Sequence, residues 1–251
     1  ALEKNQDLKS ALLAETPWVL QAQSEARQKQ QIGLLFDLNR MADEQQRALT
    51  QLAERQRSDG GFSWFPGGPD NWYITQYIVE GLGHLDRLGV KRLKDQPNGR
   101  QITDRALQYV DGQIEELYNQ LEERVKQGHT TWKDDHLSQI VIHYLYARSF
   151  FQEAEMDKEL TEIRDYFLKQ AETYWTDRNL YQQGMIALAL HHYGKTTVTD
   201  DILRSLKERS LYKEEMGRYW KTTWGYFWYQ MPIETHALMI ELFDEVAGDA
   251  Q

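Results

Sequence analysis

The residues of this chain best suited to catalysis are acidic side chains close to aromatic-rich segments. Asp59 and Asp70 flank one such segment, and Glu234 follows another. Two carboxylates across a cleft can hydrolyse a glycosidic bond, and a tyrosine or histidine base with an arginine or a metal serves polysaccharide lyases. Aromatic rings also stack on sugars. No spacing in the sequence pairs these acids, so a carbohydrate-active enzyme is kept as an alternative function.

Histidines are too scattered along the chain to predict a metal site. There are seven of them and no cysteine. They are His84, His129, His136, His143, His191, His192 and His236. His136 and His143 lie two helical turns apart, too far to share a metal without other ligands, and no His-Glu-x-x-His motif occurs. Asp134-Asp135-His136 lacks a spaced third aspartate, so these acids are interpreted as a helix N-terminus. No metal and no cofactor is predicted.

The chain also lacks a recognisable nucleophile. The absence of cysteine excludes a thiol nucleophile within it, and no Gly-x-Ser-x-Gly turn is present. Ser58 and Ser63 are interpreted as turn residues, and His129 as an exposed histidine in a loop between helices. No catalytic residue is therefore predicted.

Composition indicates a folded globular protein, and the absence of a linker-like tract favours a single domain over residues 1–251. Hydrophobic residues make up 41% of the chain and charged residues 27%, as in folded globular proteins. The net charge of −10 argues against a nucleic-acid partner, which needs a concentrated basic face. The apolar run at 185–190 is far shorter than the ~20 residues of a membrane-spanning helix, so direct membrane contact is not expected. No signal peptide is visible.

Apolar residues recur at helical spacing along nearly all of the chain. Between Ile102 and Val125 they follow one another in steps of three and four, which places them on one helix face. Gly89, Gly128 and Gly194 stand where helices are expected to end. Helices are predicted over 17–38, 40–57, 71–88, 101–127, 134–151, 157–175, 178–193, 199–209 and 232–247. Strict alternation is not sustained anywhere, so strands are not expected.

Glycine-rich and aromatic loops separate some of these helices. We expect the glycines after Asp59 to permit a tight turn, and Trp64 and Phe65 to fold back as buried plugs over helix ends. Full burial would make Trp64→Ala cost about 3–5 kcal/mol. The residues assigned a structural role in these loops are Gly60, Gly61, Phe62, Trp64, Phe65, Trp72, Trp224 and Trp228. Weakly repeated aromatic-loop and helix units predict an all-α fold, most of an α/α toroid, with an open right-handed superhelix as the competing architecture.

The first glycine loop also carries a family resemblance. Residues 59–65, Asp-Gly-Gly-Phe-Ser-Trp-Phe, followed by Trp-Tyr-Ile-Thr-Gln-Tyr at 72–77, resemble the thioester-domain region of bacterial alpha-2-macroglobulin-like proteins. These are relatives of complement component three. Segments 16–20, 34–41 and 228–239 are similar to the same region in homologues from Bacteroidetes. The resemblance extends over most of the chain, and its motifs are specific only as a set.

The resemblance implies a non-catalytic part of a broad-spectrum protease inhibitor. Such proteins trap proteases by collapsing after a bait segment is cut, sometimes with covalent capture by a thioester in a Cys-x-Glu-Gln motif. This chain has no cysteine, so we expect the motif to lie before Ala1 or to be lost, and the toroid to be incomplete. The expected partners are target proteases and neighbouring β-sandwich domains. The expected location is the periplasm or cell surface, with anchoring through another part of the protein.

A second, shorter resemblance concerns the same loop. Gln56-x3-Gly60-x-Phe62 resembles the glutamine–tryptophan motif of terpenoid cyclases and prenyltransferases, which share the toroid and use the motif to brace neighbouring helix pairs. We interpret it as structural here. Two expectations separate the candidate functions. A thioester-domain piece should bury its aromatic residues and expose apolar helix faces, whereas a toroid enzyme should have a complete ring and an open acidic cleft lined by aromatics.

Overall fold

The computed structural model describes residues 38–88, 97–215, 217–221 and 232–247. It divides the chain into two compact units, 1–55 and 56–251. Of the first unit, the described part is helix α4, Leu38–Arg55. All the other described elements belong to the second unit. The single domain expected over 1–251 stays a prediction, and the helix expected over 17–38 lies outside the described residues.

The second unit is built from helices, as the sequence predicts. Its α-helices are α5 (Trp72–Arg87), α6 (Pro97–Lys126), α7 (Gln139–Ser149), α8 (Lys158–Tyr174), α9 (Leu180–His192), α10 (Thr196–Arg209) and α11 (Pro232–Leu242). A 3₁₀ turn, Trp175–Asp177, follows α8, and a π-helical turn, Phe243–Ala247, continues α11. These bounds agree with the predicted helices to within a few residues at most ends, and the all-α class is confirmed.

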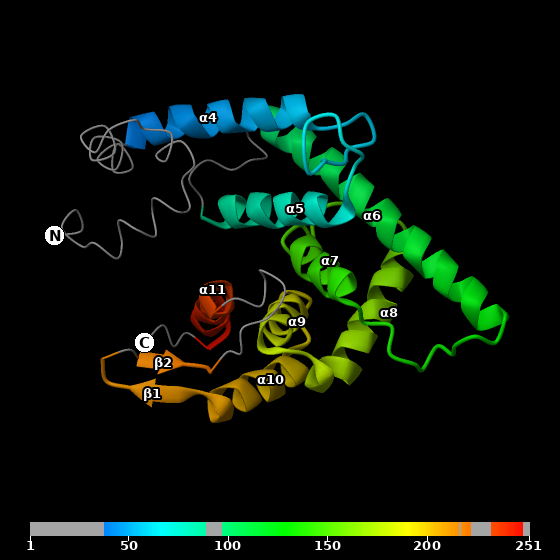
Figure 1. Ribbon diagram of the computed structural model, residues 1–251, viewed down its shortest axis with the longest axis vertical. Coiled ribbons are helices and arrows are strands. Elements are labelled where there is room, and N and C mark those ends of the chain that lie inside the picture. The colour runs from blue at the N-terminus through cyan, green and yellow to red at the C-terminus, as the bar shows by residue number, and fades with distance from the viewer. Residues whose placement is uncertain (1–37, 89–96, 216, 222–231, 248–251) are drawn as a thin grey trace. The chain divides into compact units, whose positions relative to one another are not determined.

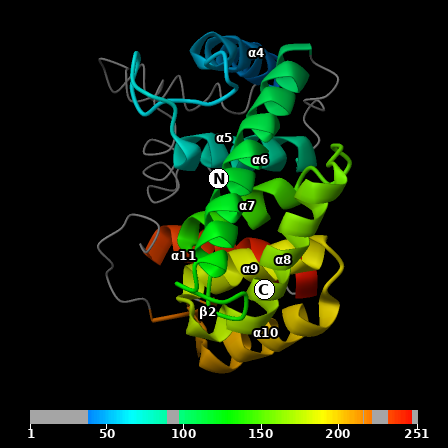
Figure 2. The same cartoon turned by 90° about the vertical axis from the view of Figure 1, so that its right-hand side faces the viewer.

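The helices of this unit alternate between two layers. α5, α7, α9 and α11, the inner helices, pack one against the next, while α6, α8 and α10, the outer helices, pack outside them (Figures 1 and 2). Every residue from Val141 to Ser149 in α7 and from Gln183 to Leu190 in α9 is buried. A helix that is apolar all round belongs inside a larger core. The alternation is common to the toroid and the open superhelix, and closure into a ring stays a prediction.

Two of the three glycines expected at helix ends do end helices, and the third, Gly89, lies outside the described residues. Gly128 follows α6 with φ of +75°, and Gly194 follows α9 with φ of +74°. In each case the next backbone N–H bonds back to the carbonyl five residues earlier, from His129 to Arg124 and from Lys195 to Leu190. These are Schellman turns, in which a left-handed residue lets the last helical carbonyls be satisfied.

The expectation of no strands is wrong for one short hairpin. β1 (Leu211–Lys213) pairs antiparallel with β2 (Gly217–Tyr219) between α10 and α11. Each strand has three residues, too few for alternation of apolar and polar residues to show in the sequence. Gly217, with φ of +69°, opens the second strand.

The interpretation of Asp134 and Asp135 as a helix N-terminus is also wrong. α7 begins at Gln139 after the cap residue Ser138. Asp134 instead accepts hydrogen bonds from the Thr131 amide at 2.7 Å and the Thr130 hydroxyl at 2.8 Å. Asp135 accepts the Leu137 amide and pairs with the Arg178 guanidinium. Both acids therefore order the loop before α7, a role that short side chains next to turns share with true helix caps.

Candidate functional site

The glycine loop before α5 is seated directly on α6. The Gln56 side-chain amide donates to the Gly60 carbonyl at 2.9 Å and to the Ile102 carbonyl at 3.0 Å. Gly60 has φ of +93°, and a Cβ there would overlap the Arg105 carbonyl. A Cβ on Gly61 would lie 2.8 Å from the Tyr109 ring. The glutamine and the two glycines thus brace this loop against the neighbouring helix.

The side chains that follow the glycines point in two directions. Phe62 is 2% exposed, and its amide donates to the Thr75 hydroxyl at 2.9 Å. Trp64 and Phe65 are 62% and 63% exposed. The expectation that these two rings plug helix ends is therefore wrong. Ser63 pairs with Asp70 in an isolated antiparallel bridge, so the chain between them turns outward and carries both rings away from the core.

Of the remaining loop aromatics, one can be placed. Trp72 is the first residue of α5 and is partly buried. Its indole nitrogen is buried without a hydrogen-bond partner among the described residues. Trp224 and Trp228 lie outside the described residues.

Two of the three acids singled out by sequence are engaged within the glycine loop. Asp59 and Asp70 meet at Arg57, which lies 3.9 and 4.0 Å from their carboxylates. The Tyr109 hydroxyl donates to Asp70 at 2.6 Å, and this bond lowers the pKa of that carboxyl. An acid that is held ionised does not suit the role of general acid. Glu234 lies in the first turn of α11.

A polar cluster that sequence reasoning missed joins the inner helices. It consists of Glu80 and His84 on α5, His143 and Tyr146 on α7, and Glu241 on α11. His143 Nε2 lies 2.7 Å from Glu80, and the Tyr146 hydroxyl donates to Glu241 at 2.7 Å. His84 lies 3.7 Å from both carboxylates. The four-residue step from Glu80 to His84 is visible in the sequence, but nothing there brings α5 beside α11.

The charges in this cluster compensate one another. Burial would raise the pKa of Glu80, but the hydrogen bond with His143 and the nearby His84 imidazole outweigh burial and lower that pKa to about 2. Burial opposes a charge on His84, yet the nearby carboxylates of Glu80 and Glu241 raise its pKa. Burial raises the pKa of Glu241, which His84 offsets only in part. The arrangement is a histidine between two carboxylates, and it holds α5 and α11 together.

Next to this cluster lies a serine, a histidine and a glutamate in relay geometry. Ser149 Oγ is 2.5 Å from His192 Nδ1, and His192 Nε2 is 2.6 Å from Glu245. Such a series resembles a hydrolytic triad with the two imidazole nitrogens exchanged, since in a triad Nε2 faces the serine and Nδ1 faces the acid. However, Ser149 is 2% exposed and also donates to the Tyr146 carbonyl at 2.6 Å. Arg87 pairs with Glu245 as well. A substrate has no access to this serine, so we assign the three residues a structural role.

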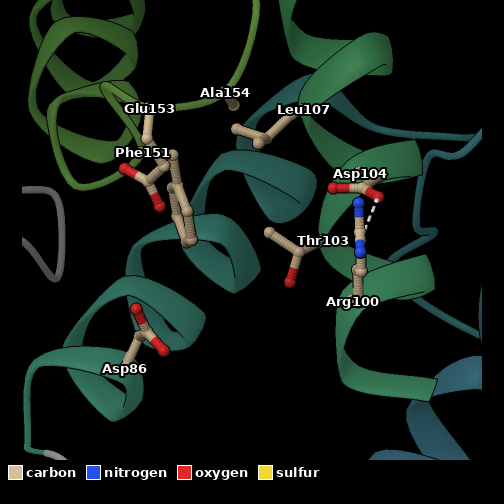
Figure 3. A pocket seen from close by; sticks show the side chains of 8 residues that line it. All are labelled: Asp86, Arg100, Thr103, Asp104, Leu107, Phe151, Glu153 and Ala154. Carbon is tan, nitrogen blue, oxygen red and sulfur yellow. Dashed lines mark ion pairs between the residues drawn. The ribbon is translucent and has the colours of Figure 1, made fainter. Parts of the chain in front are cut away.

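Among the described residues, an open pocket of about 400 Å³ lies beside this core (Figure 3). Its walls are α5, α6 and the turn after α7, with Leu107 and Phe151 as apolar lining. Three carboxylates, Asp86, Asp104 and Glu153, surround it, and Arg100 lies 3.6 Å from Asp104. No histidine, tyrosine or serine lines it. Among the described residues, no three histidines or acids are placed to hold a metal ion.

A crevice between α5, α7 and α9 is too narrow to admit a water molecule. It is lined by Tyr73, Tyr77, Glu80, Gln139, His143, Tyr181 and Met185. His129, the loop histidine, is exposed after the end of α6. Neither place brings a nucleophile, a base and a substrate-sized space together.

None of the described helices is both long enough and apolar enough to cross a bilayer.

Comparison with known proteins gives no family assignment. No protein-family model matches the chain, and no curated protein matches it in sequence.

Proposed function

We propose that this chain is a helical interaction domain of a bacterial alpha-2-macroglobulin-like protease inhibitor and that it turns over no substrate itself. The observation that carries the proposal is the seating of the glycine loop. Three of the residues that carry the family resemblance, Gly60, Gly61 and Phe62, make packing contacts that fix this loop against α6 and the start of α5. The motif thus serves the architecture of the helical layers.

The polar groups of the domain support a role without turnover. The carboxylates of Glu80, Glu241 and Glu245 are engaged by histidine, tyrosine and arginine respectively, and the relay serine is buried. A general acid must be protonated. Glu80 and Glu245 do not suit that role because their pKa values are lowered to about 2, and Glu241, whose pKa burial raises, is engaged by the Tyr146 hydroxyl.

In this proposal the parent polypeptide is exported, faces the periplasm or cell surface and is anchored elsewhere. Its partners are target proteases and neighbouring β-sandwich domains. Cleavage of a bait segment releases a conformational collapse that encloses the protease. A thioester, where the parent has one, needs a cysteine from outside these residues, because none occurs within them.

Complex formation tests the proposal. The parent polypeptide is mixed with an active serine endopeptidase, or with the same enzyme after its active serine has been blocked, and the mixtures are separated by native size-exclusion chromatography. We expect a stable complex with the active enzyme alone, because trapping requires cleavage. Absence of a complex, or equal binding of both forms, would contradict trapping.

Covalent capture of the protease by a thioester is tested by a separate measurement. Intact mass of the parent is measured before and after methylamine, with peptide mapping of the modified site. A methylamine adduct at a glutamine and one new free thiol would establish the thioester. An unchanged mass would leave a trap that acts without a covalent bond.

A carbohydrate-active toroid enzyme is the second candidate. Exposed rings favour it, because Trp64 and Phe65 were expected to be buried in a thioester-domain piece. Exposed apolar residues on α11 favour the inhibitor domain, since Ile233 and Ile240 are 76% and 69% exposed. A screen of this chain against polysaccharides, read by new reducing ends or unsaturated sugars, separates the two. Release of product from any glycan would support the enzyme.

A further inference from the structure

The loop between Ser63 and Asp70 holds two large aromatic rings outward in a fixed geometry. Ser63 and Asp70 pair across its base. The Phe65 carbonyl accepts hydrogen bonds from the Gly68 amide at 3.0 Å and the Ser63 hydroxyl at 2.8 Å. The Arg57 guanidinium donates to the Gly68 carbonyl at 2.9 Å. Because these bonds fix the backbone, Trp64 and Phe65 are presented at little cost in ordering entropy on binding.

The exposure of these rings is unusual for side chains of their size. Trp64 and Phe65 are adjacent and more than three-fifths exposed, and Trp64 stacks on Tyr73 with ring centroids 6.2 Å apart. Tyr77, one turn further along α5, is 49% exposed. Isolated exposed apolar residues are ordinary, but contiguous patches mark interaction sites. Tryptophan in particular is enriched at the energetic centres of interfaces.

The size of the patch determines which kind of partner it can hold. Aromatic side chains bury about 150–250 Å² each, so the exposed parts of these three rings offer roughly 300–400 Å². A freestanding protein complex needs about 800 Å² on each partner. A domain tethered on the same polypeptide needs much less, since a tether supplies an effective concentration in the millimolar range. The area therefore favours a tethered occupant.

The charge of the loop restricts the partner further. Residues 57–71 contain two acids, Asp59 and Asp70, and one basic residue, Arg57, which lies 3.9 and 4.0 Å from their carboxylates, so the net charge of this segment is −1. An anionic membrane surface attracts basic segments and repels this one. A polypeptide surface with lysine or arginine around an apolar pocket is complementary to it.

We propose that Trp64 and Phe65 form a docking anchor that inserts into an apolar pocket with a basic rim on a neighbouring domain of the same polypeptide. The inference rests on the proposed function, which supplies such a neighbour. It adds the contact surface, the residues that make it and the chemistry of the surface that receives them.

Hydroxyl-radical footprinting of the parent polypeptide tests the anchor, with Trp132 as internal reference. Trp132 is 37% exposed and lies in a different tryptic peptide, between Lys126 and Lys133. In the present chain alone, Trp64 should oxidise about 1.7 times as fast as Trp132, which is the ratio of their exposed fractions. In the parent, docking should lower this ratio below 1. An unchanged ratio would overturn the proposal.

Two other outcomes would also overturn it. Protection of Trp64 already in the present chain would place the cover within these 251 residues. Protection in the parent only after addition of phosphatidylglycerol vesicles would make the occupant a membrane.

Failure of the parent to trap proteases, with Trp64 still protected, would remove the proposed function and leave the anchor in place.

A pair of variants adds an independent readout. Trp64→Ala should lower the unfolding temperature of the domain within the parent and leave that of the present chain unchanged. Tyr212→Ala serves as the matched control, because Tyr212 is 69% exposed on the β1 strand. It should change neither temperature. Equal shifts for Trp64→Ala in both contexts would mean that the ring acts only within this domain.

Discussion

Replacing Gly60 by alanine tests the seating of the glycine loop. Gly60 has φ of +93°, and the left-handed region costs a non-glycine residue about 1–2 kcal/mol. The new Cβ would also overlap the Arg105 carbonyl oxygen and lie 2.8 Å from its carbonyl carbon. These are backbone atoms of α6, so the clash cannot be relieved by a rotamer change, and overpacking of this kind costs about 1–3 kcal/mol. The free energy of unfolding should therefore fall by about 2–5 kcal/mol.

The same chain offers a matched control for this substitution. Gly67 has φ of +80°, but a Cβ there would meet nothing within 4 Å. Gly67→Ala carries the conformational cost alone, so it should lower the free energy of unfolding by about 1–2 kcal/mol. Both variants are measured by urea unfolding with circular dichroism. Equal losses in the two variants would refute the contact between the loop and α6.

Four further outcomes follow from the packing and the charges. Phe62→Ala should lower the free energy of unfolding by about 3–5 kcal/mol because the ring is buried. Trp64→Ala in this chain should change it by less than about 0.5 kcal/mol because the ring is exposed. Urea titrations with similar midpoints for both variants would contradict this difference. His84→Gln should cost more stability at about pH 5.5 than at about pH 8.5. The pKa of His84 is raised in the folded state, so protonated His84 stabilises the fold below the unfolded pKa of 6.5, and this contribution is lost as the pH rises through the folded pKa. Thermal melts that show an equal cost at both pH values would rule this out. Glu80, whose pKa is lowered to about 2, should stabilise the fold above pH 4.5 and lose this contribution as the pH falls from 4.5 to about 2. Glu80→Gln should therefore cost the least stability in thermal melts at acid pH. A fluorophosphonate reagent should leave Ser149 unmodified because it is buried, and mass spectrometry that finds an adduct there would reopen the question of hydrolysis.

The fold could be predicted where local signals agree with tertiary packing. The spacing of apolar residues in α6 and the glycines after α6 and α9 each fix an element within its own segment. The errors arise where the deciding contact lies outside the segment. Asp134 and Asp135 have the chemistry of helix caps, but the Thr130 hydroxyl and the Arg178 guanidinium engage them in the loop. The short β1–β2 hairpin has too few residues for any periodic signal.

The candidate site illustrates the same limit. Sequence identified the glycine loop as structural, but composition cannot distinguish a ring that points inward from one that points outward. Phe62 and Trp64 lie two residues apart in the same loop, and the bridge between Ser63 and Asp70 separates their environments. The cluster around His84 could not be found, because Glu80 and Glu241 come from helices far apart in the chain.

Inhibition that depends on substrate size is the measurement that tests the proposed trap most directly. The parent polypeptide is incubated with an endopeptidase, and the remaining activity is measured on a large protein substrate and on a small chromogenic peptide. An enclosed protease cannot reach a large substrate, while a small peptide still diffuses to its active site. The account predicts loss of activity on the protein with activity on the peptide retained. Equal loss of both, or loss of neither, would contradict it.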